Sequence, residues 1–522
     1  MKFVTDPAIA LKIDRMKERV RWQHPSVLKR EIDQTQLVIE APDTDNPEFS
    51  FLVIGDSGSG YHRGDNPQRQ VAKSLLKQRD QCRFVLHTGD VIYLVGSSEQ
   101  YPQNFIQPYR EFLVGGADPD QIAYDRMVFN YPFLPVPGNH DYYDLPFVFG
   151  AIAQSLLPVR RLLRYQLDLD VGWHGSRKGD AYARAFLDYL LTKEGDALSR
   201  HLDRHYTAKT ASHCCLRYQP EKFTRLPNRY YSFRVGGIDF FALDSNTFNA
   251  PLPLEDLDAW QITQQQLTAR RQQLISRKQQ LLNQATDLES LPEEADSDEA
   301  NDLYGKVEQV EEQIRDIEKQ LNADRQQSDV DTEQLNWLQT RLIQSWQDPD
   351  VRGRVIYFHH PPYVTEATKW YQGQTLAIRQ RLRQVLDGVE QAVGDRPPSQ
   401  PLVNLIISGH AHCFEYLKTA ETGHGDAHLN WVVCGGSGYS LRRQRPEGSV
   451  LTEALTDDQS RVVAKSHCFA GRNGHGSQKR HPYSFLRVDV RAGCPPQVVL
   501  RPFIVERYQR SWQEYALDPI SL

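Results

Sequence analysis

Leu402-Val-Asn-Leu-Ile-Ile-Ser-Gly-His-Ala-His412 is an apolar run that ends in a glycine turn carrying two histidines. The run is short, rich in branched aliphatic residues and bounded by Ser-Gly, which predicts a buried β-strand. The turn then presents His410 and His412 at the carboxyl end of that strand. Glycine at position 409 permits the positive φ or close backbone approach that such a turn often needs.

Four other segments repeat this arrangement, each placing polar side chains in a turn after an apolar run. They are Gly55-Asp56-Ser57-Gly58, Gly89-Asp90-Val91-Ile92-Tyr93, Gly138-Asn139-His140-Asp141 and His359-His360-Pro361. Strand-like runs precede three of them directly, at 51–54, 84–86 and 355–358. The run at 131–136, before Gly138, contains prolines that weaken its strand character. The chain therefore predicts carboxylates, imidazoles and an amide gathered at strand ends.

Such a set of side chains suits a two-metal hydrolytic centre, because nitrogen and oxygen donors of this kind bind first-row and related divalent cations. Taken singly, each has a plainer explanation. Asp56 or Asp90 alone would be interpreted as a helix N-cap, and His359 with His360 as a buried, hydrogen-bonded pair. Five segments occurring together favour the metal centre instead.

The five segments, in this order, resemble the calcineurin-like metallophosphoesterases and, more narrowly, their purple acid phosphatase-like variant. In the wider superfamily the first segment reads Asp-x-His, with the histidine as a ligand; here Gly58 stands at that position. The ligand reappears as Tyr93 in the Gly-Asp-x-x-Tyr segment. This paired exchange is the purple acid phosphatase pattern. The resemblance covers about 51–144, 229–250 and 331–505.

The resemblance implies a binuclear metal centre with Asp90 as the bridging carboxylate. One metal ion would be completed by Asp56, Tyr93 and His412, and the other by Asn139, His359 and His410. The cofactors implied are two divalent or mixed-valence metal ions, with Fe, Mn or Zn as the candidates. A tyrosinate ligand would favour ferric iron, yet a reducing compartment argues against assuming it.

In the implied reaction, a metal-bound hydroxide attacks phosphorus and His140 protonates the leaving-group oxygen or contacts a phosphate oxygen. A histidine titrating near neutral pH suits that role. His360 is expected to lie just behind the metal ligands or to contact the substrate. His424 and His475, both in loops, are further candidates for substrate contact.

Composition limits the class of protein. The chain has 522 residues, 39% of them hydrophobic, and a formal net charge of −6, which gives no nucleic-acid-binding signature. No apolar run approaches the 18 or so residues of a transmembrane segment, and the first residues lack a signal-peptide core. Seven cysteines without a CxxC motif indicate reduced thiols, so a cytoplasmic location is expected.

The expected fold class is α/β, namely the four-layer α/β/β/α metallophosphoesterase sandwich with an inserted helical hairpin, or coiled coil. The expected order is an N-terminal helical extension (1–48), a first core segment (49–144), an insertion (145–228), a second core segment (229–254), the inserted hairpin (255–330) and a third core segment with C-terminal strands (331–522). The fold itself is implied by the resemblance, since spacing shows only alternating strands and helices.

The insertion at 145–228 is expected to form a lid or wall of the active site, because it follows His140 directly. Phe147 to Leu157 predicts a short apolar helix, for which burial in protein is favoured over contact with a membrane. Arg160, Arg161 and Arg164 follow it and are either exposed to solvent or available to bind a substrate phosphate.

The hairpin at 255–330 is predicted from a heptad-like apolar pattern. The pattern consists of Leu267, Leu274, Leu281 and Leu288, then Leu303, Val307, Val310, Ile314, Ile317 and Leu321. A polar, acidic break at 291–298 separates the two arms. An antiparallel hairpin projecting from the catalytic domain would bury this pattern internally; a homodimer or a protein partner bound through 255–330 is the alternative.

The predicted function is therefore a metal-dependent phosphoesterase, that is, a phosphatase acting on a phosphorylated small molecule or another phosphoester. Phosphodiesterase or nucleotide pyrophosphohydrolase activity is one alternative, because the same centre handles all three kinds of bond. A catalytically idle scaffold acting through the hairpin is the other. Specificity in such enzymes lies in loops and insertions, so the sequence leaves the natural substrate open.

Overall fold

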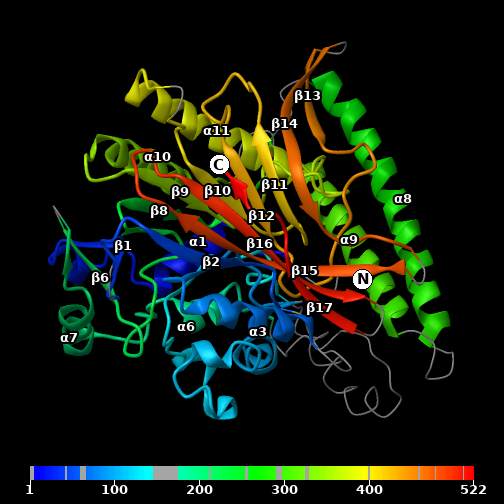
Figure 1. Cartoon of the computed structure of the whole chain (residues 1–522). Helices are drawn as coiled ribbons and strands as arrows, with labels where there is room; N and C mark the ends of the chain where they lie inside the picture. The colour runs from blue at the N-terminus through cyan, green and yellow to red at the C-terminus, as the bar shows by residue number, and fades with distance from the viewer. Residues whose placement is uncertain are drawn as a thin grey trace.

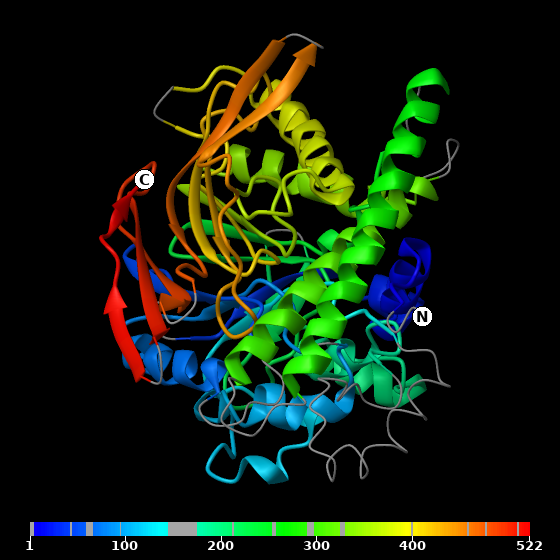
Figure 2. The same cartoon turned by 90° about the vertical axis from the view of Figure 1, so that its right-hand side faces the viewer.

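The structure is a computed structural model that describes residues 5–41, 44–58, 66–93, 95–144, 175–210, 213–252, 257–289, 297–323, 329–397, 400–456, 459–475, 478–508 and 511–522. It is a mixed α/β fold built on two sheets, which Figures 1 and 2 show from perpendicular directions. In the described residues, no helix is long and apolar enough to cross a membrane.

The smaller sheet has the order β17-β16-β15-β2-β3-β4, with β18 pairing with β16. Its strands are β2 (Phe49–Ile54), β3 (Val85–His87), β4 (Phe133–Pro135), β15 (Arg480–Val490), β16 (Val498–Tyr508), β17 (Ser511–Ala516) and β18 (Ile520–Ser521). Strands β2, β3 and β4 run parallel, whereas β15 joins β2 antiparallel and forms a C-terminal hairpin with β16. The carboxyl ends of β2, β3 and β4 therefore meet at one edge.

The larger sheet has the order β13-β14-β11-β12-β10-β9-β8-β7-β1-β6-β5. Its strands are β1 (Ile32–Ile39), β5 (Ala208–Lys209), β6 (Cys214–Tyr218), β7 (Tyr231–Val235), β8 (Ile238–Ala242), β9 (Gly353–Tyr357), β10 (Leu405–Ser408), β11 (Phe414–Thr419), β12 (Asn430–Cys434), β13 (Val450–Thr456) and β14 (Gln459–Ala470). Strands β8, β9, β10 and β12 are parallel neighbours. Their apolar runs are continuous because both faces of the sheet are covered.

Successive residues of these parallel strands face opposite sides, as a pleated strand requires. In β8, Phe240 belongs to a core shared with the smaller sheet, whereas Phe241 belongs to a second core with helices. The Phe240 ring meets Phe51 of β2 edge-on at 5.4 Å and Phe84 at 5.3 Å. The two sheets therefore pack face to face through aromatic side chains.

Helices cover the outer faces of both sheets. On the larger sheet, α10 (Thr332–Gln347) and α11 (Gly373–Val393) contribute Leu338, Leu342 and Ile378 to the second core. Against the smaller sheet, α3 (Pro67–Arg79) buries Val71 and Leu75. Shorter helices are α1 (Ile9–Arg19), α2 (Pro25–Leu28), α6 (Asp180–Phe186), α7 (Gly195–His205) and a series of single turns, η1 to η6, at 98–100, 102–106, 110–112, 119–121, 124–126 and 245–247.

Two segments differ in some respects from the sequence-based expectation. The stretch 1–48 contains the expected helix, yet it also ends in β1, which pairs with β7 and β6 inside the larger sheet. In the insertion, residues 175–228 supply α6, α7, β5 and β6, and the two strands extend the larger sheet. The expected apolar helix at 147–157 and the three arginines at 160, 161 and 164 lie outside the described residues.

Helices α8 (Leu257–Glu289) and α9 (Ser297–Leu321) lie side by side along one flank of the molecule (Figures 1 and 2). Leu274 and Leu281 of α8 form a small core with residues of α9: Leu303, Val307, Val310 and Ile317. Gly305 brings α9 close to the body of the protein, because a Cβ there would stand 2.4 Å from the Ser440 hydroxyl. The pair of helices is therefore not a free projection, since α9 packs on the body.

Candidate metal centre

All five segments singled out in the sequence lie at the carboxyl ends of strands. Asp56 follows β2, Asp90 and Tyr93 follow β3, and Asn139 with His140 follow β4, all in the smaller sheet. The larger sheet contributes the histidines that follow β9 and β10, namely His359, His360, His410 and His412. Since the two sheets pack face to face, these turns meet in one buried place between them.

The backbone at this place is held in unusual conformations. Asp56, Asp90 and His410 have φ of 52°, 54° and 65°, in the left-handed region that costs non-glycine residues energy. The aspartates also accept backbone hydrogen bonds: His410 N–H donates to Asp56 Oδ2 at 2.8 Å, and His140 N–H donates to Asp90 Oδ1 at 2.8 Å. These bonds tie the turns together and fix the carboxylates.

The Tyr93 hydroxyl is the middle of a first cluster. It lies 3.0 Å from Asp56 Oδ1, 2.8 Å from Asp90 Oδ2 and 3.0 Å from His412 Nε2. His412 Nδ1 faces the carbonyl oxygen of Ser440 at 2.9 Å, and a carbonyl only accepts, so a neutral His412 carries its proton on Nδ1 and has a bare Nε2. One hydroxyl proton cannot serve three acceptors at once. A cation would satisfy all of them.

A second cluster surrounds His359 Nε2. This atom lies 2.9 Å from Asn139 Oδ1, 3.2 Å from His410 Nδ1 and 3.3 Å from Asp90 Oδ2. His359 Nδ1 faces the carbonyl oxygen of Thr88 at 2.8 Å, so a neutral His359 also turns a bare Nε2 toward these neighbours. Lone pairs again converge, and Asp90 Oδ2 is common to both clusters.

These two clusters fit a pair of metal ions in the chemistry of their donors. The ligand atoms of Asp56, Asp90 and His359 lie within 4.8 Å of one another, and all three residues are buried. Burial alone would lower the pKa of His359, yet Asp90 and Asp56 raise it to about 9. A proton on His359 thus balances some of the carboxylate charge, a balance that a cation would provide instead.

His140 and His360 lie beside the clusters. The His140 side chain is 9% exposed; its Nε2 is 4.0 Å from Asp90 Oδ2 and 3.6 Å from Glu308 Oε1. His360 is 2% exposed, and its Nδ1 is 2.8 Å from the Ser245 hydroxyl, while its Nε2 has no hydrogen-bond partner among the described residues. His359, His360 and His410 form a second group able to hold a metal ion.

Asp141 is a buried neighbour to which the sequence analysis gave no role. Its Oδ2 accepts from the backbone N–H of Gly138 at 2.8 Å and of Val91 at 3.4 Å, which joins the turns after β3 and β4. Burial and the nearby Asp90 raise its pKa to about 8. The signal was present in the sequence, because Asp141 closes the Gly-Asn-His-Asp segment.

Glu308, Glu312 and Lys369 were also missed, although they stand beside the histidines. Glu312 Oε1 is 3.0 Å from His410 Nε2 and forms an ion pair with Lys369, whose Nζ is 2.9 Å from the same nitrogen. Burial and Lys369 lower the pKa of His410 to about 3. Residues 308, 312 and 316 are acidic at a spacing of four, which marks one face of a helix. The sequence therefore showed the acidic face of this helix, but it did not show that the face contacts His410.

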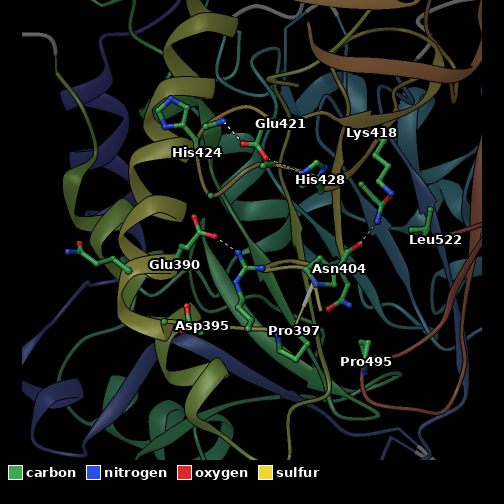
Figure 3. Close-up of a pocket in the computed structure, with 18 of the residues that line it drawn as sticks. Glu390, Asp395, Pro397, Asn404, Lys418, Glu421, His424, His428, Pro495 and Leu522 are labelled. Atoms are coloured by element: carbon green, nitrogen blue, oxygen red, sulfur yellow. Dashed lines mark hydrogen bonds and ion pairs between the residues drawn. The ribbon is translucent and has the colours of Figure 1, made fainter. Parts of the chain in front are cut away.

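A separate groove of about 910 Å³ lies at the amino ends of strands in the larger sheet, away from the carboxyl ends that carry the histidines (Figure 3). Asn404 and Asn430, at the amino ends of β10 and β12, are among its lining residues. His424 lines it too and pairs with Asp387, at 2.9 Å. His424, which was expected to contact the substrate, therefore belongs to this groove and not to the candidate metal centre.

No protein-family model and no curated protein matches the sequence. Among solved structures, the chain has weak similarity to GAP50, the anchor in the inner membrane complex of Plasmodium, at 11% identity, TM-score 0.37 and coverage of 88% of this chain and 84% of that one. It has similar likeness to the purple acid phosphatase PPD1 from yellow lupin (Lupinus luteus) seeds, at 12% identity, TM-score 0.38 and coverage of 92% and 54%. PhoD is similar at 11% identity and TM-score 0.38, with coverage of 91% of this chain and 69% of that one. The chain spans about half the length of the lupin protein.

Proposed function

We propose that this protein is a metal-dependent phosphoric ester hydrolase of the metallophosphoesterase type, in the purple acid phosphatase-like variant. The observation that carries the proposal is Asp90, whose Oδ2 is shared by two clusters of converging lone pairs. The two packed sheets with α3 on one outer face and α10 and α11 on the other support the four-layer α/β/β/α description of the fold.

In this proposal, the first cluster holds one cation through Asp56, Asp90, Tyr93 and His412. The second holds another through Asp90, Asn139, His359 and His410. When bound, two divalent cations neutralise phosphate charge and promote ionisation of water near neutral pH. Nitrogen and oxygen donors of this kind suit Fe, Mn or Zn.

The remaining residues position the reaction. His140 stands beside Asp90, and its ring also packs on Tyr93, with centroids 4.2 Å apart. From there it holds a proton for the departing alkoxide or orients a phosphate oxygen. His360, held by Ser245 and with Nε2 unpaired among the described residues, is suited to contact the substrate or to add to the ligands of the second cation.

The test is hydrolysis of p-nitrophenyl phosphate and bis-p-nitrophenyl phosphate by the purified chain with Mn, Fe, Zn or Mg added, beside Asp90→Asn. The proposal expects metal-dependent hydrolysis that Asp90→Asn abolishes. A preference for the monoester supports a phosphatase, and a preference for the diester supports the phosphodiesterase alternative. No hydrolysis with any metal, together with no bound metal, would favour the idle scaffold.

Location and partners belong to the proposal as well. All seven cysteines are free thiols, which supports a reducing, cytoplasmic compartment. The apolar pattern of α9 is covered by α8, which supports internal pairing of the two arms, the coiled-coil interpretation, over a homodimer or a protein partner through 255–330.

A further inference from the structure

The three histidines of the two clusters have their outer nitrogens fixed in two different ways. His359 and His412 each face a backbone carbonyl, of Thr88 and Ser440. His410 faces no carbonyl through its outer nitrogen, Nε2, among the described residues; it meets Glu312, Lys369 and Gln374 instead. The Glu312 carboxylate is the acceptor among these three groups that carries a negative charge.

For His410 the tautomer matters. Its Nδ1 points to the second cluster, 3.2 Å from His359 Nε2, so Nδ1 must be bare if His410 is to bind a cation there. The proton must then sit on Nε2 and needs an acceptor. Lys369 and the Gln374 amide nitrogen are donors, which by themselves favour a bare Nε2. The Glu312 carboxylate is the one of these three groups that can accept a hydrogen bond from Nε2, and it also accepts from Lys369.

Glu312 has a charged partner in this setting, because its carboxylate forms an ion pair with the Lys369 ammonium as well as facing His410. The Glu312 side chain is only 14% exposed and that of Lys369 only 3%, so solvent cannot easily replace either.

The helix that carries Glu312 is attached to the body on both sides of it. Glu308, one turn earlier, pairs with Arg442, whose guanidinium also donates to the Gly305 carbonyl at 2.8 Å. Asp316, one turn later, accepts the backbone N–H groups of Gly373 and Gln374 at the start of α11, at 2.9 and 3.1 Å. Such a fixed helix can set the place of a carboxylate.

We infer that α9 of the inserted hairpin belongs to the metal centre, with Glu312 as a positioning residue that holds His410 in the tautomer able to bind a cation. This inference rests on the proposed two-metal function. It assigns the inserted hairpin a role in the centre itself, beyond a lid or a docking arm.

Metal binding by the full chain tests it. Chelator-treated protein is titrated with Mn²⁺ by calorimetry, as wild type, Glu312→Gln, Glu312→Met and Glu311→Ala. Gln and Met remove the same charge at similar length, but only Gln keeps an oxygen that accepts from His410. Glu311→Ala is the control, because Glu311 pairs with Lys278 of α8.

The expected result is that Glu312→Met weakens one of two binding events about 10- to 100-fold, the scale of a lost outer-shell partner. Glu312→Gln recovers most of that affinity, and Glu311→Ala matches wild type. Equal loss in Gln and Met, or no loss in Met, overturns the inference while leaving the proposed function in place. Wild type that binds no metal overturns both. Should Glu312→Met not fold, Glu312→Ala is measured instead under the same criteria.

Discussion

Asp90 Oδ2 lies 3.3 Å from His359 Nε2, although the two residues follow strands of different sheets. The same carboxylate oxygen is 2.8 Å from the Tyr93 hydroxyl. Asp90 thus joins the two sheets and the two clusters of donors through a single oxygen atom. The role proposed for Asp90 therefore depends on the negative charge of its carboxylate as well as on the shape of its side chain.

Asp90→Asn is expected to lower phosphoesterase turnover at least about 100-fold. The amide has nearly the same shape, so it retains an oxygen for the His140 N–H, but it lacks the charge for bridging two cations. Steady-state hydrolysis of p-nitrophenyl phosphate measures the effect, and circular dichroism checks that the fold is kept. Turnover like that of wild type would contradict the proposed role.

His140→Ala is expected to lower turnover by about 10²- to 10⁴-fold, the range for loss of a positioned proton donor, with metal content unchanged. The matched control is His424→Ala, which removes an imidazole from the distant groove and should leave turnover intact. A drop in bound metal equal to the drop in turnover would instead identify His140 as a ligand.

Tyr93→Phe separates the hydroxyl from the ring. The ring stacks on Tyr439 with centroids 3.8 Å apart, and phenylalanine keeps that contact. The variant should therefore fold, yet bind one of the two cations at least about tenfold more weakly, because an oxygen between Asp56 and His412 is gone. Metal titration with a thermal-unfolding check measures both, and unchanged affinity would remove Tyr93 from the ligand set.

Metal removal should make stability depend on pH. In the metal-free protein the pKa of His359 is raised to about 9 from its ordinary 6.5, so its contribution to folding is present below pH 6.5 and lost as the pH rises through 9. The pKa of Asp141 is raised from 3.8 to about 8, so its contribution to stability is also lost as the pH rises, over a range that ends near pH 8. The Tm of chelated protein should fall between pH 6.5 and 9, and a Tm that rises across that window would refute this.

Much of the centre could be predicted from the sequence because its signals are local. Each of Asp56, Asp90, Asn139, His359 and His410 stands in a turn just after an apolar run, and parallel strands bring such turns to a common edge. The joining of the two sheets was implied by the resemblance of the five segments, taken together, to a known family, because spacing alone shows only alternating strands and helices.

What could not be predicted depends on distant pairing. Strand β1 has the sequence Ile-Asp-Gln-Thr-Gln-Leu-Val-Ile, whose polar first half and irregular register hide a strand that its neighbours β6 and β7 stabilise. Strands β13 and β14, at the sheet edge, contain many polar residues and were not recognised for the same reason. The role of Glu312 depends on where α9 docks, and helical spacing reveals a face but not what it meets.

Metal content is the most direct test of the central claim. Elemental analysis of purified wild type, after saturation with Mn, Fe or Zn and removal of excess, should give about two metal ions per chain, and Asp90→Asn should give at most about one. A wild-type chain that retains none of these metals would contradict the two-metal centre.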